Sequence, residues 1–201
     1  MLDGGPRKDR NTSAMCASFA KGAAGAGAET ETVRLFDYSY TGCRSCFACK
    51  VRGGSSFGRC GWRDGISELL EAAANADGVV FASPVYLGTI TPQLHAFVER
   101  LVFLHSLRQK LQRHCSERFE TAVIYTMNVK GDIRDEYIGA ENGGPLGFFE
   151  RYVTRVFTKR TRLCLNTYQF DDYGKYVADG WTSGKRRNGG RESSAGAAKR
   201  L

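Results

Sequence analysis

The chain has 201 residues, of which 42% are hydrophobic, enough to bury the core of one ordinary domain but not of two full ones. No apolar run approaches the length of a transmembrane helix, and the N-terminus lacks the charged-then-apolar pattern of a secretion signal. The sequence therefore predicts a cytoplasmic protein without a membrane partner.

The formal net charge of +8 is concentrated near the C-terminal end. The segment from Thr182 onward contains six basic residues and one acidic residue. It is otherwise rich in Gly, Ser and Ala and has no apolar periodicity. Such a segment buries too little surface to offset its ordering entropy. We predict a folded domain over residues 1–181, a disordered basic tail over residues 182–201, and no nucleic-acid partner for the folded domain.

Apolar periodicity predicts alternating helices and strands along the folded part. Asn11 or Thr12 is expected to cap the first helix and Asp64 the second, because their side-chain oxygens accept hydrogen bonds from free backbone amides. Strands alternating with helices at this spacing need right-handed crossovers, which give a parallel sheet between two helical layers. The expected helices cover residues 12–28, 64–76, 92–104 and 148–158, and the expected strands residues 31–38, 78–86, 121–126 and 162–168.

Parallel sheets bind ligands at the carboxyl ends of their strands, so the loops there are the candidates for a binding site. Residues 4–13 are rich in Gly and lead directly into a helix, whose first amides and positive dipole end suit a phosphate. Arg7 offers a bidentate fork, and Asn11, Thr12 and Ser13 supply short donors. A solvated turn with a capping residue is the alternative for this loop taken alone.

The second candidate loop, residues 83–89, leaves an apolar strand and contains an aromatic residue, a glycine and small hydroxyl residues. Tyr86 is placed to cover the face of a flat aromatic cofactor, with backbone amides reaching the polar edge of a flavin. The alternative is that Tyr86 is an ordinary half-buried aromatic of a strand.

Four cysteines lie in a long loop, residues 39–63. The spacing C-x2-C-x2-C-x10-C suits adjacent corners of a [4Fe–4S] cluster with a more distant fourth thiolate. Zinc sites more often use two separated C-x2-C pairs, so zinc is the weaker alternative, and four free or redox-active thiols are a further one. The candidate ligands are Cys43, Cys46, Cys49 and Cys60.

The chain resembles the NAD(P)H-dependent FMN reductase and iron-sulfur flavoprotein family of the flavodoxin-like superfamily. The family's phosphate loop reads Asn-Gly-Ser-Pro-Arg-Lys and then Asn-Thr. Residues 3–8, which read Asp-Gly-Gly-Pro-Arg-Lys, and Asn11 with Thr12 are similar, and Gly5 stands in place of Ser. The Ser-Pro-Val-Tyr segment of the family is matched at residues 83–86. The resemblance implies FMN contacts from Gly5, Arg7, Asn11, Thr12, Ser13, Ser83, Pro84, Val85, Tyr86, Gly88, Thr126 and Met127.

The same resemblance implies a three-layer α/β/α, flavodoxin-like fold with strand order 2-1-3-4-5. It implies an FMN-dependent oxidoreductase that accepts hydride from NAD(P)H and passes electrons to a flavin, quinone or other small acceptor, in a homodimer or higher homo-oligomer. The cofactor performs the chemistry, so no side chain is assigned as catalytic. The alternative is an electron carrier with FMN, and with a [4Fe–4S] cluster if the cysteines hold one, that does not turn over nicotinamide directly.

The first strand of the fold is expected to be truncated. In the family a buried strand of about five residues precedes the phosphate loop, a usual strand length, whereas only Met1, Leu2 and Asp3 precede Gly4 here. We therefore expect weaker stability and FMN affinity than in a chain extended by a few apolar residues.

Overall fold

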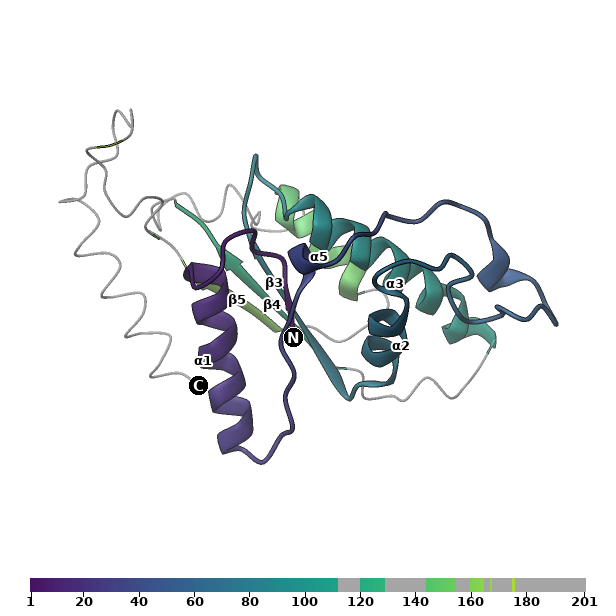
Figure 1. The fold of residues 1–201 in the computed structure, drawn as a ribbon, viewed down its shortest axis with the longest axis horizontal. Coiled ribbons are helices and arrows are strands. Elements are labelled where there is room, and N and C mark those ends of the chain that lie inside the picture. Colours follow the sequence, from purple (N-terminus) through teal and green to yellow (C-terminus); the bar gives the residue numbers. More distant parts are fainter. Residues whose placement is uncertain (112–119, 129–143, 155–159, 165–166, 168–174, 176–201) are drawn as a thin grey trace.

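A computed structural model describes residues 1–111, 120–128, 144–154, 160–164, 167 and 175. A parallel sheet with strand order β2-β1-β3-β4-β5 runs through the centre of the molecule (Figure 1). This order and the α/β architecture confirm the flavodoxin-like fold class. The strands are β1 (Leu2–Asp3), β2 (Val33–Arg34), β3 (Gly78–Pro84), β4 (Glu120–Thr126) and β5 (Arg160–Cys164).

Helices cover both faces of the sheet, which gives the expected three layers (Figure 1). The helix α1 packs on one face, while α2, α3 and α5 pack on the other and form the larger core. The helices are α1 (Asn11–Gly25), α2 (Ser67–Asn75), α3 (Pro92–Leu111) and α5 (Pro145–Thr154), with the 3-10 turns η1 (Leu35–Asp37) and η2 (Ala48–Lys50).

Alternate residues of β3 serve the two cores, as the pleat of a strand requires. Val79 and Phe81 point into the larger core, and Val80 and Ala82 face α1. The small side chain of Ala82 leaves room for α1, whose Cys16 is fully buried against this face. Burying a side chain of the size of Phe81 contributes about 1.5–3 kcal/mol, so this strand stabilises both layers.

The strand expected over residues 31–38 is shorter than predicted. Only Val33–Arg34 pairs in the sheet, and the chain then turns through η1. Leu35 is fully buried, and Arg34 forms an ion pair with Asp37 at 3.1 Å across this turn. The alternation of Val33 and Leu35 resembles a strand, but the local i,i+3 pair ends the ladder.

The predicted cap of α1 is not formed, whereas Asp64 keeps a capping contact at the start of α2, where its Oδ1 accepts from the Ile66 amide at 3.3 Å. Arg10 occupies the N-cap of α1 without a side-chain cap hydrogen bond, because the Thr12 hydroxyl bonds the Thr126 hydroxyl at 2.8 Å instead. The helix α2 begins at Ser67 rather than at Asp64, whose carboxylate pairs with Arg100 at 2.6 Å. A tertiary contact thus replaces the predicted cap of α1, while at α2 the ion pair with Arg100 is added to the local contacts of Asp64.

Several predictions fall outside the described residues. They include the tail over residues 182–201, the boundary at residue 181, the end of the helix expected to reach residue 158, and most of the strand end after Cys164. Among the residues that the structure describes, no helix is long and apolar enough to cross a membrane.

Candidate functional site

The loop that follows β1 is fixed to the sheet and to the start of α3. The amide of Gly4 donates to the carbonyl of Ala82 at 2.8 Å, and the Thr91 hydroxyl donates to the Gly4 carbonyl at 2.9 Å. A Cβ atom at Gly4 would lie 3.0 Å from the Ala82 carbonyl oxygen and 3.0 Å from the Leu94 Cβ. This close approach of backbones requires glycine.

A buried carboxylate shapes the same loop from below. Asp3 is 2% exposed, and its two oxygens accept from the Gly5 amide at 2.7 Å and from the Ser13 hydroxyl at 2.6 Å. Arg34 supports the loop from β2 by donating to the Pro6 carbonyl at 3.2 Å. The path of the loop is therefore set before any ligand is present.

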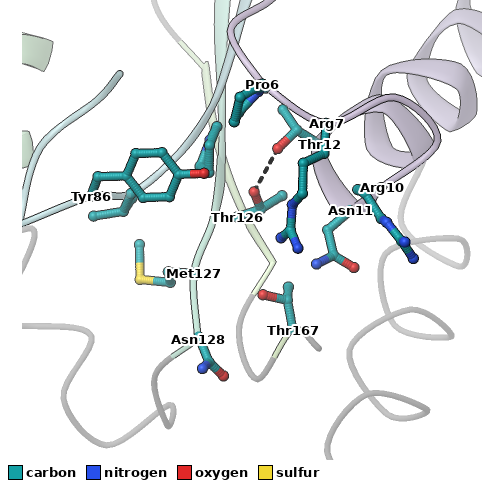
Figure 2. A pocket seen from close by; sticks show the side chains of 13 residues that line it. Pro6, Arg7, Arg10, Asn11, Thr12, Tyr86, Thr126, Met127, Asn128 and Thr167 are labelled. Atoms are coloured by element: carbon teal, nitrogen blue, oxygen red, sulfur yellow. Dashed lines mark hydrogen bonds between the residues drawn. The ribbon is translucent and has the colours of Figure 1, made fainter. Parts of the chain in front are cut away.

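A cavity of about 260 Å³ opens at the carboxyl edge of the sheet, between this loop and the ends of β3 and β4 (Figure 2). Arg7 and Asn11 lie at one end of it, and Tyr86 and Met127 lie at the other. No acidic side chain is found among the described lining residues, so the end with the arginines suits an anion. The lining residues are Gly5, Pro6, Arg7, Arg10, Asn11, Thr12, Pro84, Val85, Tyr86, Thr126, Met127, Asn128 and Thr167.

Most of the residues proposed from the sequence meet at this one cavity, although they come from three separate segments. Ser13, Ser83 and Gly88 do not line it. Ser13 donates to Asp3, while Ser83 donates to the Pro84 carbonyl at 2.7 Å and accepts from the Thr91 amide at 3.0 Å. These two hydroxyls hold the loops rather than face the cavity.

Gly88 instead forms a tight turn that presents Tyr86. Leu87 and Gly88 have φ of 49° and 82°, and the amides of Tyr86 and Thr89 each donate to the other's carbonyl. Two consecutive positive φ angles are typical of a type I′ turn. The glycine is needed for the shape of this turn.

The amide donors that the sequence suggested for the ring edge are partly occupied. The Val85 amide donates to the Thr126 carbonyl at 3.0 Å, and the Tyr86 amide donates to Thr89 at 2.9 Å. Polar contacts to a ring at this end must therefore come from other lining groups, such as the side chains of Asn128 and Thr167.

Sequence analysis missed four lining residues: Pro6, Arg10, Asn128 and Thr167. Arg10 was recognisable as a second arginine three positions after Arg7. Thr167 lies next to the cavity because its amide donates to the Met127 carbonyl at 3.3 Å, a contact between distant segments that no local pattern signals.

The four cysteines of the long loop line a second, much smaller cavity of about 20 Å³. Burial raises the pKa of the Cys49 thiol, and the nearby thiols of Cys60, Cys46 and Cys43 raise it further, against the effect of Lys50. The four cysteines that the sequence singled out therefore line one cavity. Within the described part of the chain, however, no three metal-ligating side chains are grouped closely enough to hold a metal ion.

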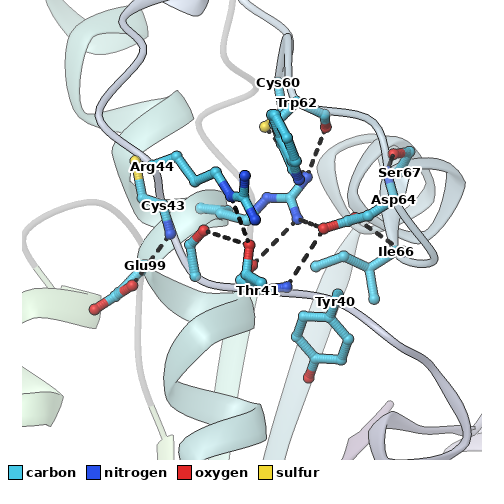
Figure 3. Close-up of polar contacts among 12 residues, drawn as sticks. Tyr40, Thr41, Cys43, Arg44, Cys60, Trp62, Asp64, Ile66, Ser67 and Glu99 are labelled. Atoms are coloured by element: carbon cyan, nitrogen blue, oxygen red, sulfur yellow. Dashed lines mark hydrogen bonds and ion pairs between the residues drawn. The ribbon is translucent and has the colours of Figure 1, made fainter.

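Arg100 of α3 ties both ends of the cysteine loop together. Figure 3 shows the polar contacts around Thr41, Trp62 and Asp64, which lie at these two ends. The Arg100 side chain is 1% exposed and pairs with Asp64 at 2.6 Å. It also donates to the Thr41 carbonyl at 3.3 Å, the Trp62 carbonyl at 2.9 Å and the Cys60 sulfur at 3.3 Å. Burial lowers the pKa of Arg100, but the hydrogen bonds that Arg100 donates to Asp64 and Cys60 outweigh burial, so the pKa is raised.

The model of the family described as NADPH-dependent FMN reductase matches residues 1–125, more than half of the chain. The chain belongs to this family. It is 32% identical to an iron-sulfur flavoprotein from Methanocaldococcus jannaschii over 99 residues, and 33% identical to one from Methanosarcina thermophila over 103 residues. The matches span 49% of this chain and 49% of the first relative, and 51% of each for the second.

Solved structures show the same fold as this family member. An NAD(P)H:quinone oxidoreductase from Methanothermobacter marburgensis superposes with a TM-score of 0.61 at 13% identity, covering 98% of this chain and 92% of the other. At this identity the likeness concerns the fold alone.

The two cavities differ in how well they fit the cofactors of such proteins. The larger one has cationic side chains beside the amide-rich start of α1, and an aromatic and apolar wall opposite, which fits FMN. The four thiols have the chemistry of an iron-sulfur ligand set, but their cavity would have to widen before a cluster could enter.

Proposed function

We propose that the chain binds FMN in the larger cavity and acts as an oxidoreductase that takes hydride from NAD(P)H and reduces a flavin, quinone or other small acceptor. The observation that carries this proposal is that one cavity has Arg7 and the start of α1 at one end and Tyr86 at the other. FMN, when bound, supplies the acceptance of hydride and its release as electrons. The protein supplies binding and orientation.

At the phosphate end, Arg7 and Arg10 provide charge, and α1 provides amides. The first helical hydrogen bond runs from Ala14 to Arg10, so the amides of Asn11, Thr12 and Ser13 precede it, and no described side chain caps this turn. Such amides bind a phosphate well because the helix dipole adds to their donors.

At the other end, Tyr86 and Met127 supply apolar contact for a ring system. Tyr86 remains 45% exposed, so the mouth of the cavity beside it is open to a second substrate such as a nicotinamide. The buried hydrogen bond of 2.8 Å between Thr12 and Thr126 joins the two ends and fixes their spacing. No side-chain acid or base is required by this proposal.

Anaerobic rapid mixing tests the proposal. Protein loaded with FMN is mixed with NADPH or NADH, and the flavin absorbance is followed. We expect bleaching within seconds and recovery when a quinone is added. FMN that binds but bleaches only with a protein donor would contradict the reductase and favour a carrier.

The convergence of four cysteines on one cavity supports a second candidate, an electron carrier that holds a [4Fe–4S] cluster as well as FMN. Anaerobic reconstitution with iron and sulfide tests it. We expect iron and acid-labile sulfide to bind, and Cys46→Ser to remove both while FMN stays. The control Cys16→Ala changes a thiol of α1 that is buried against the sheet and should leave the iron content unchanged. A site that takes only zinc, or no metal, would contradict the cluster.

We further propose that the protein is a cytoplasmic homodimer. Tyr86 and Leu87 leave apolar surface exposed at the mouth of the cavity, which supports a contact there. Light scattering after size exclusion tests the oligomeric state, and a monomer at micromolar concentration would contradict the proposal.

A further inference from the structure

The carboxylate of Asp3 occupies an unusual place for a site that receives a phosphate. It is buried in β1 between β2 and β3, directly below the loop that lines the cavity. Its oxygens accept from the Gly5 amide and the Ser13 hydroxyl. Both donors belong to the segment that the phosphate would approach.

The same carboxylate also lies at the positive end of α1. That helix has no acidic residue in its first turn and no side-chain cap within the described structure. Asp3 reaches Ser13, the third residue of the helix, and so places a negative charge where one is stabilising. In the ligand-free protein, Asp3 takes the electrostatic role that a bound phosphate would otherwise take.

The glycine at position 5 follows from this arrangement. A Cβ at Gly5 would lie 2.9 Å from the Asp3 Oδ1 and 3.2 Å from the Thr12 Cβ. Asp3 therefore occupies the Gly5 amide, and a side chain at position 5 would require its carboxylate to shift. The loop keeps its shape at the expense of one donor to the ligand.

We infer that Asp3 is a specificity-determining residue that competes with the ligand's phosphate for the start of α1 and weakens FMN binding relative to riboflavin. The inference rests on the proposed FMN site. A fixed carboxylate and a bound phosphate repel each other, and inside a protein this repulsion is far less screened than in water. The protein gains a stable empty site and an FMN that exchanges more readily.

The isosteric variant Asp3→Asn separates charge from shape. The amide oxygen still accepts from Gly5 and the amide nitrogen donates to Ser13, so the loop keeps its two hydrogen bonds. We expect FMN to bind about tenfold more tightly and riboflavin within about twofold of the original protein. We also expect the melting temperature without ligand to fall by about 2–4 °C, because α1 loses its compensating charge.

In Asp3→Asn the affinity for FMN should rise while the melting temperature falls. A merely structural role of Asp3 would lower both the affinity and the melting temperature. Asp3→Ala removes the charge and both hydrogen bonds, and the ratio of FMN to riboflavin affinity should rise in it too. Asp77→Asn is the matched control, because Asp77 is exposed just before β3, at the opposite edge of the sheet. It should change the ratio by less than about twofold, since that charge lies far from the site.

Three results would decide against the inference. An unchanged ratio in Asp3→Asn, with FMN still preferred by the original protein, overturns the role of Asp3 and leaves the proposed function standing. A fall of the ratio in Asp3→Ala overturns it as well. Failure of all forms to bind FMN in titration calorimetry overturns the proposed function, and the role of Asp3 with it.

Discussion

The phosphate loop after β1 and the cysteine loop over residues 39–63 leave neighbouring strands, yet they are held in different ways. The first is fixed to the sheet by one backbone hydrogen bond to β3 and by the side chains of Asp3 and Arg34, and it borders a cavity of about 260 Å³. The second rests on side chains of α3, chiefly Arg100 and Glu99, around a cavity of about 20 Å³. The loop that is tied to the sheet borders an open cavity, whereas the loop that is tied to α3 surrounds a much smaller one.

Removing Arg100 should have the largest effect on stability, because it acts on the loop that is held by α3. In Arg100→Met the carboxylate of Asp64 loses its 2.6 Å partner, and the carbonyls of Thr41 and Trp62 lose a donor. Breaking a buried ion pair by removing one member destabilises by about 3–5 kcal/mol. We expect that loss in urea unfolding of the reduced protein without ligand.

The control for Arg100→Met is Arg44→Met in the same loop. Arg44 is exposed and stacks on Trp62 at 3.7 Å, a contact worth about 0.5–1 kcal/mol. Equal losses in the two variants would show that the loop does not depend on the buried arginine.

The phosphate loop should respond in affinity rather than in stability. Arg7→Ala removes a cation from the cavity lining, and losing a charge-assisted contact of about 1.5–3 kcal/mol weakens FMN roughly ten- to a hundredfold. Riboflavin, which has no phosphate, should bind as before. Fluorescence titration with both ligands measures the difference.

Lys8→Ala is the matched control for Arg7, because Lys8 is the next residue, is exposed and does not line the cavity. It should change the affinity for FMN by less than about threefold, as expected of a screened surface charge. An equal loss of FMN and riboflavin in Arg7→Ala would contradict the placement of the phosphate.

The cysteine cavity should also be visible in thiol chemistry. The pKa of Cys49 is raised, chiefly by burial, so less thiolate is present at pH 8 than in an ordinary cysteine. Because Cys43 and Cys46 are exposed, we expect iodoacetamide to modify them about tenfold faster than Cys49 in protein without metal. The difference between these modification rates should become smaller as the pH rises and should disappear in urea. Equal rates in the native protein, followed by mass spectrometry, would show that the cavity is open.

Features that depend on a local sequence pattern were predicted, whereas contacts between distant segments were not. The layers were predicted from the alternation of helices and strands, and the strand order from the family resemblance. Most of the larger cavity was predicted because glycine, arginine and short polar residues next to a helix start have a local physical meaning. The Cys spacing predicted a shared site, and the thiols do converge. What was missed depended on distant partners: Asp64 pairs with Arg100 besides its contact to the Ile66 amide, and Ser13 bonds Asp3 instead of facing the cavity. No sequence pattern within a few residues of Asp64 or Ser13 indicates these contacts.

The smallest expected effect concerns the turn at the mouth of the larger cavity. Leu87 has φ of 49°, a left-handed conformation that is unfavourable for a leucine, and its side chain is fully exposed. Asparagine adopts this conformation more readily, so Leu87→Asn should stabilise the protein by about 1 kcal/mol, or about 2–4 °C in melting temperature. FMN affinity should change by less than about twofold, since Leu87 does not line the cavity. The control Leu87→Ala keeps the strained backbone and should give no gain. If Leu87→Asn instead lowered the melting temperature and dissociated a dimer in light scattering, the leucine would be buried between two copies of the chain, and the strained turn would serve that contact rather than the presentation of Tyr86.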